Sequence, residues 1–529
     1  MYNKYQYSVL IFFFVILILP LIGILSKINF DINYTLDFLK NSYLRRIIFF
    51  TLYQAFLSAL ISCILAIPFA LALNRHKNIK LVKFIISLCG FTFVIPSILI
   101  VYAVIKIFGI NGFLNSYFNF YEIFSIESIY GIKAILIAHI MLNTPFATRL
   151  FFQNLNTIPK KYYEISNSVN LSYFGNIINL ELPIIKQNLF TVFAIIFSLC
   201  FLSFAIVMAL GGGPMYSTIE VSIYQYALYE LNFNKAIILS FIQIIICSFF
   251  VFIGFFKLKG SNFFEIEINS GVHPHQKFKS VIITDLILIL IFSLVLFSPI
   301  IIIFFNFFSN FFNNFYYEIN LLKALLNSFI ISIFTGIFVS IAGFAISTLL
   351  VINHKNIFFQ QILFFSSSII IIISPIIFSL GYFIVLHDLR YIALIKYLIV
   401  ILINCIFLIP FSLLILFNNL KNIYLTYQDI KISFRIKISD YLRIIFPLFK
   451  KNFLYIFSFS TVITFGDFTI ISFFKDQSFD TLPSYLFKLI AVYRFEEASF
   501  VAGLMLFISL IIYFIIDNFN YQGNPVIKT

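Results

Sequence analysis

The sequence has few charged residues, no tryptophan and only a few scattered cysteines. Charged residues make up 11% of the 529 positions, whereas apolar residues make up 61% and the mean hydropathy is +1.03. The cysteines show no CxxC spacing and lie inside apolar runs, which argues against a disulfide framework or a zinc site and favours small buried side chains. We expect no metal site. The five cysteines are Cys63, Cys89, Cys200, Cys247 and Cys405.

Long apolar runs are what the sequence does contain. Runs of about 20 residues span a bilayer as helices, whereas barrel strands would be half as long and would alternate in polarity. The sequence therefore predicts an all-α polytopic membrane protein with a retained first helix rather than a cleaved signal peptide. The expected spans are 7–26, 48–74, 82–109, 131–152, 189–211, 236–257, 281–308, 324–352, 358–386, 393–417, 453–474 and 499–517.

The net charge of +14 is best explained by membrane orientation. The basic residues are scattered between apolar runs and form no aromatic and basic face for nucleic acid. Placing the amino terminus inside puts most of the 35 Lys and Arg on the cytoplasmic side, as the positive-inside rule requires. Both termini are then cytoplasmic. The basic residues placed inside include Arg75, Lys77, Lys80, Lys160, Lys161, Lys257, Lys259, Lys431, Arg435, Lys437, Lys450 and Lys451.

Two similar polar segments divide the chain into halves. EISNSVNLSYFGNIINLELP and QDIKISFRIKISDYLRIIFP end on Pro183 and Pro447, and 447 − 183 = 264 is half the chain. Pro96 matches Pro375, and Pro145 matches Pro410. We expect two parallel six-helix halves, at 1–257 and 281–529, a cytoplasmic linker at 258–280, and cytoplasmic loops at 153–188 and 418–452.

The two segments suit docking onto a soluble partner, because each offers polar groups with a few apolar anchors. In the first, Asn170 and Gly175 tolerate the left-handed conformation in which a helix ends. The apolar anchors of the first segment are Ile165, Val169, Leu171, Ile177, Ile178 and Leu182.

This pattern resembles the signature loop of ABC importer permeases. In that loop a Glu-Ala-Ala run is followed by a Gly and then by Ile-x-Leu-Pro. Glu164 stands at the Glu, Asn170 replaces the Gly, and Leu182 and Pro183 end the motif; in the second loop Gln428 replaces the Glu, Phe434 the Gly, and Pro447 ends the segment. The resemblance implies the type I importer permease fold and two docked ATPase subunits.

Further motifs resemble the thiamine ABC transporter permease family, which also fuses two six-helix halves. They are SFAIVMALGGGPMYSTIEVSIYQYALYELNFNKA (203–236), FGDFTIISFFKDQSFDTLPSYLFKLIAVYRFEEAS (465–499) and HIMLNTPFATRLFFQNL (139–155). The resemblance implies a permease of the bacterial inner membrane that receives thiamine, or its phosphates, from a periplasmic binding protein. No G-x-x-x-x-G-K-[ST] phosphate loop is present, so we expect ATP and Mg²⁺ on the partner ATPase and no cofactor or catalytic residue here.

Several polar residues, prolines and a glycine within the spans are candidates for the translocation path. Asp467 is an acid that we expect about two turns inside a helix, where it either faces a cationic substrate or packs by hydrogen bonds to backbone or hydroxyl groups. Prolines mark either broken helices along a path or benign kinks, and Asn143 either lines the seam or joins helices. The candidate set is Pro96, Asn143, Pro145, Pro375, Pro410, Gly466 and Asp467. Outer-face charges that bind a delivery protein or stay solvated are Glu220, Glu230, Arg494, Glu496 and Glu497.

Two other transporter classes compete with this interpretation. A ferric-iron ABC importer permease shares the fold, the paired loops and the fused arrangement. A secondary transporter driven by an ion gradient would need buried coupling charges, and Asp467 is nearly alone in the spans. A membrane-embedded enzyme lacks any catalytic constellation.

Overall fold

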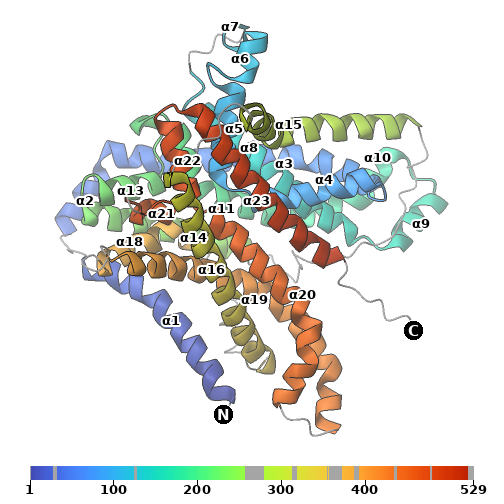
Figure 1. Cartoon of the computed structure of the whole chain (residues 1–529). Helices are drawn as coiled ribbons and strands as arrows, with labels where there is room; N and C mark the ends of the chain where they lie inside the picture. Colours follow the sequence, from blue (N-terminus) through green and yellow to red (C-terminus); the bar gives the residue numbers. More distant parts are fainter. Residues whose placement is uncertain are drawn as a thin grey trace.

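The computed structural model contains helices joined by turns and no strand in the residues that it describes, which are 2–27, 32–123, 128–255, 279–311, 319–353, 356, 361, 372–386, 392–433, 438–476 and 479–521 (Figure 1). The helices of the segment up to residue 255 are α1 (Tyr2–Ser26), α2 (Ile32–Lys40), α3 (Ser42–Arg75), α4 (Lys80–Phe91), α5 (Ser97–Phe108), α6 (Phe113–Phe118), α7 (Phe120–Ile123), α8 (Ile132–Asn156), α9 (Lys160–Ser168), α10 (Tyr173–Asn176), the π-helix η1 (Ile177–Glu181), α11 (Leu182–Phe201), α12 (Ala205–Leu210), the 3₁₀ turn η2 (Pro214–Tyr216), α13 (Ile219–Leu228) and α14 (Phe233–Phe255). Those after it are α15 (Lys279–Phe311), α16 (Ile319–Ile352), α18 (Pro375–Val385), α19 (Ala393–Ser433), α20 (Ile438–Phe465), α21 (Ile471–Phe474), α22 (Leu482–Ala491) and α23 (Phe495–Tyr521).

Within those residues, nine helices are long and apolar enough to cross a membrane, and further apolar helices are shorter. The prediction of an all-α polytopic membrane protein is confirmed. The shorter apolar stretches lie at Phe14–Ser26, Pro375–Val385, Asn452–Phe465 and Leu482–Ala491.

Three predicted spans are broken rather than continuous. The run expected at 82–109 forms α4 and α5, with Pro96 at the amino-terminal cap of α5. Proline lacks an N–H and disfavours helical geometry in the residue before it, so the chain restarts the helix at this point. The runs expected at 189–211 and 453–474 likewise divide into α11 and α12 and into α20 and α21.

The region of the second predicted loop, 418–452, is helical where it is described. Helix α19 continues to Ser433 and α20 begins at Ile438. Gln428 therefore lies in α19 and Pro447 in α20, while Phe434 lies outside the described residues. The predicted linker and the span at 358–386 also fall largely outside them.

Small and polar side chains let the long helices approach one another. Gln54 of α3 donates through Nε2 to the Cys200 carbonyl oxygen at 3.0 Å, and Ser58 lies 3.0 Å from His139 Nδ1 of α8. A Cβ atom added to Gly343 of α16 would lie 2.1 Å from Ser412 Oγ of α19. Because lipid supplies no hydrophobic force between helices, close packing and such hydrogen bonds hold the bundle together.

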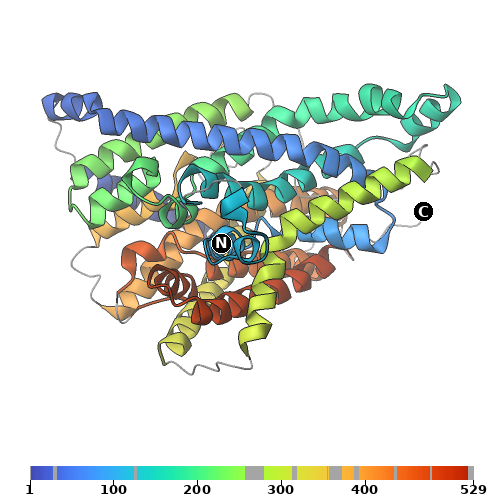
Figure 2. The ribbon, with the colours of Figure 1, turned by 90° about the horizontal axis from the view of Figure 1, so that it is seen from above.

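The first helix of each predicted half lies against the other half. Helix α1 packs on α16 and α18, whereas α15 packs on α3, α5 and α8. Figures 1 and 2 place the start of α15 at the same end of the molecule as α9 and α10. This crossing brings a second-half helix beside the first predicted docking loop.

Candidate functional site

The first predicted docking loop folds as a short helical excursion between α8 and α11. Helix α9 ends at Ser168, and Asn170 adopts the left-handed conformation with φ = 53°. This was expected of the residue at the family's Gly position. Leu171 N–H then donates to the Ser166 carbonyl oxygen at 3.1 Å, which closes the turn, and Ser166 Oγ hydrogen-bonds to Asn176 Oδ1.

Gly175 does not end a helix in the left-handed conformation, so that expectation is wrong. It lies inside α10, and its N–H donates to Ser172 Oγ at 3.1 Å. Ser172 thereby caps α10. Pro183 occupies the first turn of α11, where a missing N–H costs nothing, and α11 returns towards the bundle.

Several of the predicted apolar anchors are exposed. The exposed fractions are 58% for Ile165, 66% for Val169 and 59% for Ile178. Glu164 is exposed as well and pairs with Lys160 at 3.6 Å along α9. An outward set of apolar side chains on a polar excursion is typical of a surface that binds another protein.

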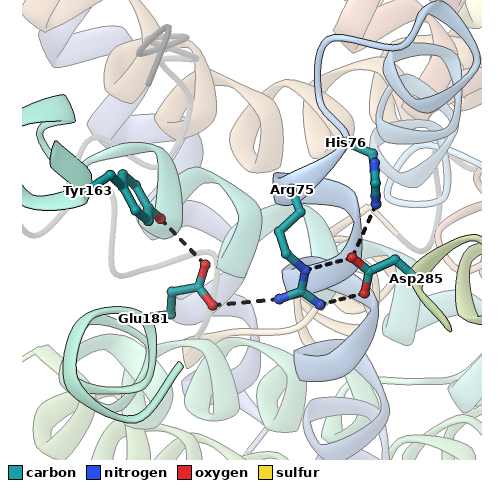
Figure 3. A network of polar contacts seen from close by, with 5 residues as sticks. All are labelled: Arg75, His76, Tyr163, Glu181 and Asp285. Carbon is teal, nitrogen blue, oxygen red and sulfur yellow. Dashed lines mark hydrogen bonds and ion pairs between the residues drawn. The ribbon is translucent and has the colours of Figure 1, made fainter. Parts of the chain in front are cut away.

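A buried network of charges lies behind this loop (Figure 3). Arg75, the last residue of α3, donates to both carboxylate oxygens of Asp285 on α15, through Nε at 2.8 Å and Nη2 at 2.7 Å. Its Nη1 lies 3.7 Å from Glu181 Oε2, and the side chains of Arg75, Glu181 and Asp285 are 3%, 0% and 1% exposed. The guanidinium thus bridges the docking loop and the first helix of the second half.

Neighbouring groups enclose this network. His76 Nε2 lies 3.1 Å from Asp285 Oδ2, and Tyr163 of α9 reaches Glu181 Oε1 at 3.5 Å. Burial and the adjacent Glu181 carboxylate raise the pKa of Tyr163. Lys77 donates to Asn156 Oδ1 at 3.0 Å, and burial lowers its pKa.

Sequence reasoning missed this network. The sequence analysis places Arg75 and Lys77 only by membrane side and does not single out Glu181, whereas all three are buried. The usable signal was Glu181 itself, the one charge in the run IINLELPII (177–185). A lone acid next to an apolar helix requires a partner.

The structure brings several candidate path residues together at the seam between the predicted halves. A Cβ atom added to Gly466 would lie 2.4 Å from Pro96 Cγ. Near them Phe93 stacks on Phe146 with ring centroids 4.6 Å apart and contacts Phe411 at 6.1 Å. These two phenylalanines directly follow Pro145 and Pro410, which lie inside α8 and α19.

Asp467 lies in the break after α20, not two turns inside a helix. Its carboxylate accepts hydrogen bonds from Thr469 N–H at 3.0 Å and Ile470 N–H at 3.2 Å, just ahead of α21. The predicted alternative in which the Asp467 carboxylate hydrogen-bonds to backbone groups is therefore present. The side chain is only partly buried, so a role on the path is compatible with this geometry.

Three further candidates, Asn143, Pro375 and Glu220, have local structural contacts. Asn143 donates to Cys200 Sγ at 3.2 Å, which joins α8 to α11. Pro375 starts α18, capped by Ser374, rather than kinking a helix. Glu220, expected on the outer surface, is fully buried and accepts from Gln243 Nε2 at 2.9 Å.

Comparison with known proteins identifies a group of relatives. No protein-family model matches the chain. Thiamine transport system permease proteins of Haemophilus influenzae and Escherichia coli are 29% and 27% identical over 487 and 489 residues, which cover 90% of this chain and 89% of each relative. The predicted resemblance to thiamine ABC permeases is confirmed. A corresponding protein of Brucella abortus is 33% identical over 204 residues, 39% of this chain and 38% of that relative. As these relatives are transport permeases, this membrane chain is similar to transport subunits rather than to enzymes.

Proposed function

We propose that this protein is the membrane-spanning permease subunit of an ATP-driven importer that moves thiamine or its phosphates into the cytoplasm. The observation that carries the proposal is similarity to thiamine transport system permease proteins across 90% of the chain. These relatives favour thiamine over the ferric-iron alternative, and neither they nor the docking loop favours an ion-driven transporter.

Two features of the fold support a pair of permease halves in one chain. Thr51 Oγ1 of α3 accepts from Ile219 N–H at 3.0 Å at the start of α13, and Ser328 Oγ of α16 accepts from Leu482 N–H at 2.8 Å at the start of α22. The same contact thus occurs once in each half. The rings of Phe204 and Phe468, which are 264 positions apart like the two loop prolines, stack with centroids 5.8 Å apart.

The partner assignments follow from this proposal. Two ATPase subunits would dock on the cytoplasmic loops, supply all ATP and Mg²⁺ chemistry and rock the halves, while a periplasmic binding protein would deliver the substrate. The exposed Ile165, Val169 and Ile178 support a docking surface on the first loop. The protein would lie in the inner membrane with both termini in the cytoplasm, as its distribution of basic residues favours.

The test is uptake of labelled thiamine by cells that lack their own thiamine importer. The cells would receive this chain with its ATPase and binding protein, and excess unlabelled thiamine or ferric iron would compete. We expect saturable uptake that only thiamine compounds reduce. An assembled complex that takes up no thiamine would refute the substrate assignment and leave the permease architecture standing.

A further inference from the structure

The ion cluster Asp285–Arg75–Glu181 joins the docking loop to a helix of the opposite half. Glu181 ends η1 in the loop, Arg75 ends α3, and Asp285 lies near the start of α15. We propose that this cluster is the mechanical link through which movement of the first docking loop reaches α15, so that one loop drives both halves. This inference rests on the proposed function.

The contacts of Arg75 with Asp285 and with Glu181 differ in length, and this difference indicates which part of the link is fixed and which can move. The guanidinium makes two short hydrogen bonds to Asp285, whereas its separation from Glu181 is 3.7 Å, beyond hydrogen-bond distance. A bidentate pair of this kind is geometrically fixed, but a longer ion contact tolerates displacement. Arg75 and Asp285 therefore form the fixed part of the link and Glu181 the movable part.

The backbone at Glu181 is suited to such movement. Residues Ile177–Glu181 form a π-helix, closed by a hydrogen bond from Leu182 N–H to the Ile177 carbonyl oxygen. A π turn holds one more residue than an α turn; it occurs mostly as a single turn within an α-helix and is frequent at functional sites. Contraction of this turn would shift Glu181 relative to Arg75 while α11 stays in place.

Two positions of the second half that correspond to Arg75 and Glu181 carry no charge. Helices α3 and α16 are both 34 residues long, and where α3 ends in Arg75, α16 ends in Ile352. Adding the loop spacing of 264 to Glu181 gives position 445, which is Ile445. Neither residue can form an ion pair, so the sequence does not place the charges of Arg75 and Glu181 at these two positions of the second half.

The experiment compares Glu181→Gln with wild type in the complete complex, with ATPase and binding protein, reconstituted in lipid vesicles. Gln keeps the size of the side chain but removes its charge, and the Arg75–Asp285 pair stays intact. The matched control is Asp37→Asn, which changes an exposed carboxylate on α2 at the other end of α3. Thiamine uptake, ATP hydrolysis and retention of the ATPase subunits are measured for each protein. Hydrogen exchange of 177–188 and 280–290 is measured with and without a non-hydrolysable ATP analogue.

We expect Glu181→Gln to lower uptake per ATP hydrolysed by about fivefold or more, the range of a typical coupling free energy, with ATPase retention unchanged. The nucleotide should change exchange in both segments of the wild type, but only in 177–188 of the variant. The link would be overturned if the variant kept the wild-type uptake per ATP hydrolysed and the wild-type hydrogen exchange in both segments. It would also be overturned if uptake, ATP hydrolysis and ATPase retention fell in parallel. If the wild-type complex takes up no thiamine, the substrate proposal is refuted. The hydrogen-exchange comparison then still tests the link.

Discussion

Arg75 and Asp285 are 210 positions apart, yet the guanidinium of one holds both carboxylate oxygens of the other within 2.8 Å. The pair fixes α15 against α3 at the end of the bundle where the first docking loop lies (Figure 3). Burial makes the pair sensitive to the loss of either member, because the remaining charge would lie in a poorly solvated site.

Removing one member of this pair should destabilise the protein strongly. We expect Asp285→Ala to lower the free energy of unfolding by about 3–5 kcal/mol, since it leaves the Arg75 charge buried without its main partner. Thermal unfolding in detergent measures the effect. Lys160→Met is the control, because it breaks an ion pair whose side chains are both 60% exposed and which contributes little. Equal unfolding temperatures for the two variants would contradict the assigned role of the pair.

Hydropathy was sufficient to predict the helical membrane fold, but not the ends of its helices. A window of apolar residues cannot distinguish one long span from two helices with a break, as at Pro96 and at Asp467. In the same way, local pattern predicted the left-handed turn at Asn170, because that depends on one residue type. Partnerships such as Arg75 with Asp285 depend on how distant helices pack, which no local pattern records.

The exposed apolar side chains of the first loop should govern ATPase docking. We expect Val169→Asp to reduce retention of the ATPase subunits by about tenfold, since a charge in the buried part of an interface costs roughly 1–3 kcal/mol or more. Affinity purification from membranes, with the permease quantified in parallel, measures retention. Leu231→Asp serves as the control because Leu231 is equally exposed, at 66%, but lies between α13 and α14. Equal retention in the two variants would exclude Val169 from the docking surface.

Glu220 should make stability depend on pH. Burial raises the pKa of Glu220 to about 8, although hydrogen bonds from Gln243 and Ser374 oppose the shift. The folded state then keeps the proton over a range in which the unfolded state, with an ordinary carboxyl pKa of about 4.3, has lost it. This contribution to stability is therefore full below the unfolded pKa and declines as the pH rises to about 8.

The substitution Glu220→Gln isolates that contribution. We expect the variant to gain stability relative to wild type as the pH rises from 5 to 8, because the amide needs no proton. Thermal unfolding temperatures of both proteins across this range give the difference, from which the contributions of other titrating groups cancel. A difference that stays constant with pH would show that Glu220 has lost its proton in the folded as in the unfolded state throughout this range, which contradicts the raised pKa.

Asp467 offers the most direct test of a residue on the translocation path. Asn retains Oδ1 as an acceptor for the Thr469 and Ile470 N–H groups, so Asp467→Asn should keep the turn before α21 while losing the negative charge. If the carboxylate attracts the fixed positive charge of the thiazolium ring, loss of an interaction of about 1 kcal/mol lowers thiamine uptake about fivefold at normal protein abundance.

Asp467→Ala completes this test, because it removes both the charge and the hydrogen bonds. The charge role predicts that Asn and Ala lower uptake to a similar extent, with only Ala lowering the unfolding temperature. A purely structural role predicts normal uptake and abundance for Asn and a loss of both for Ala. Uptake measured per folded permease separates the two, because the hydrogen-bonded turn is common to wild type and Asn whereas the charge is present only in wild type.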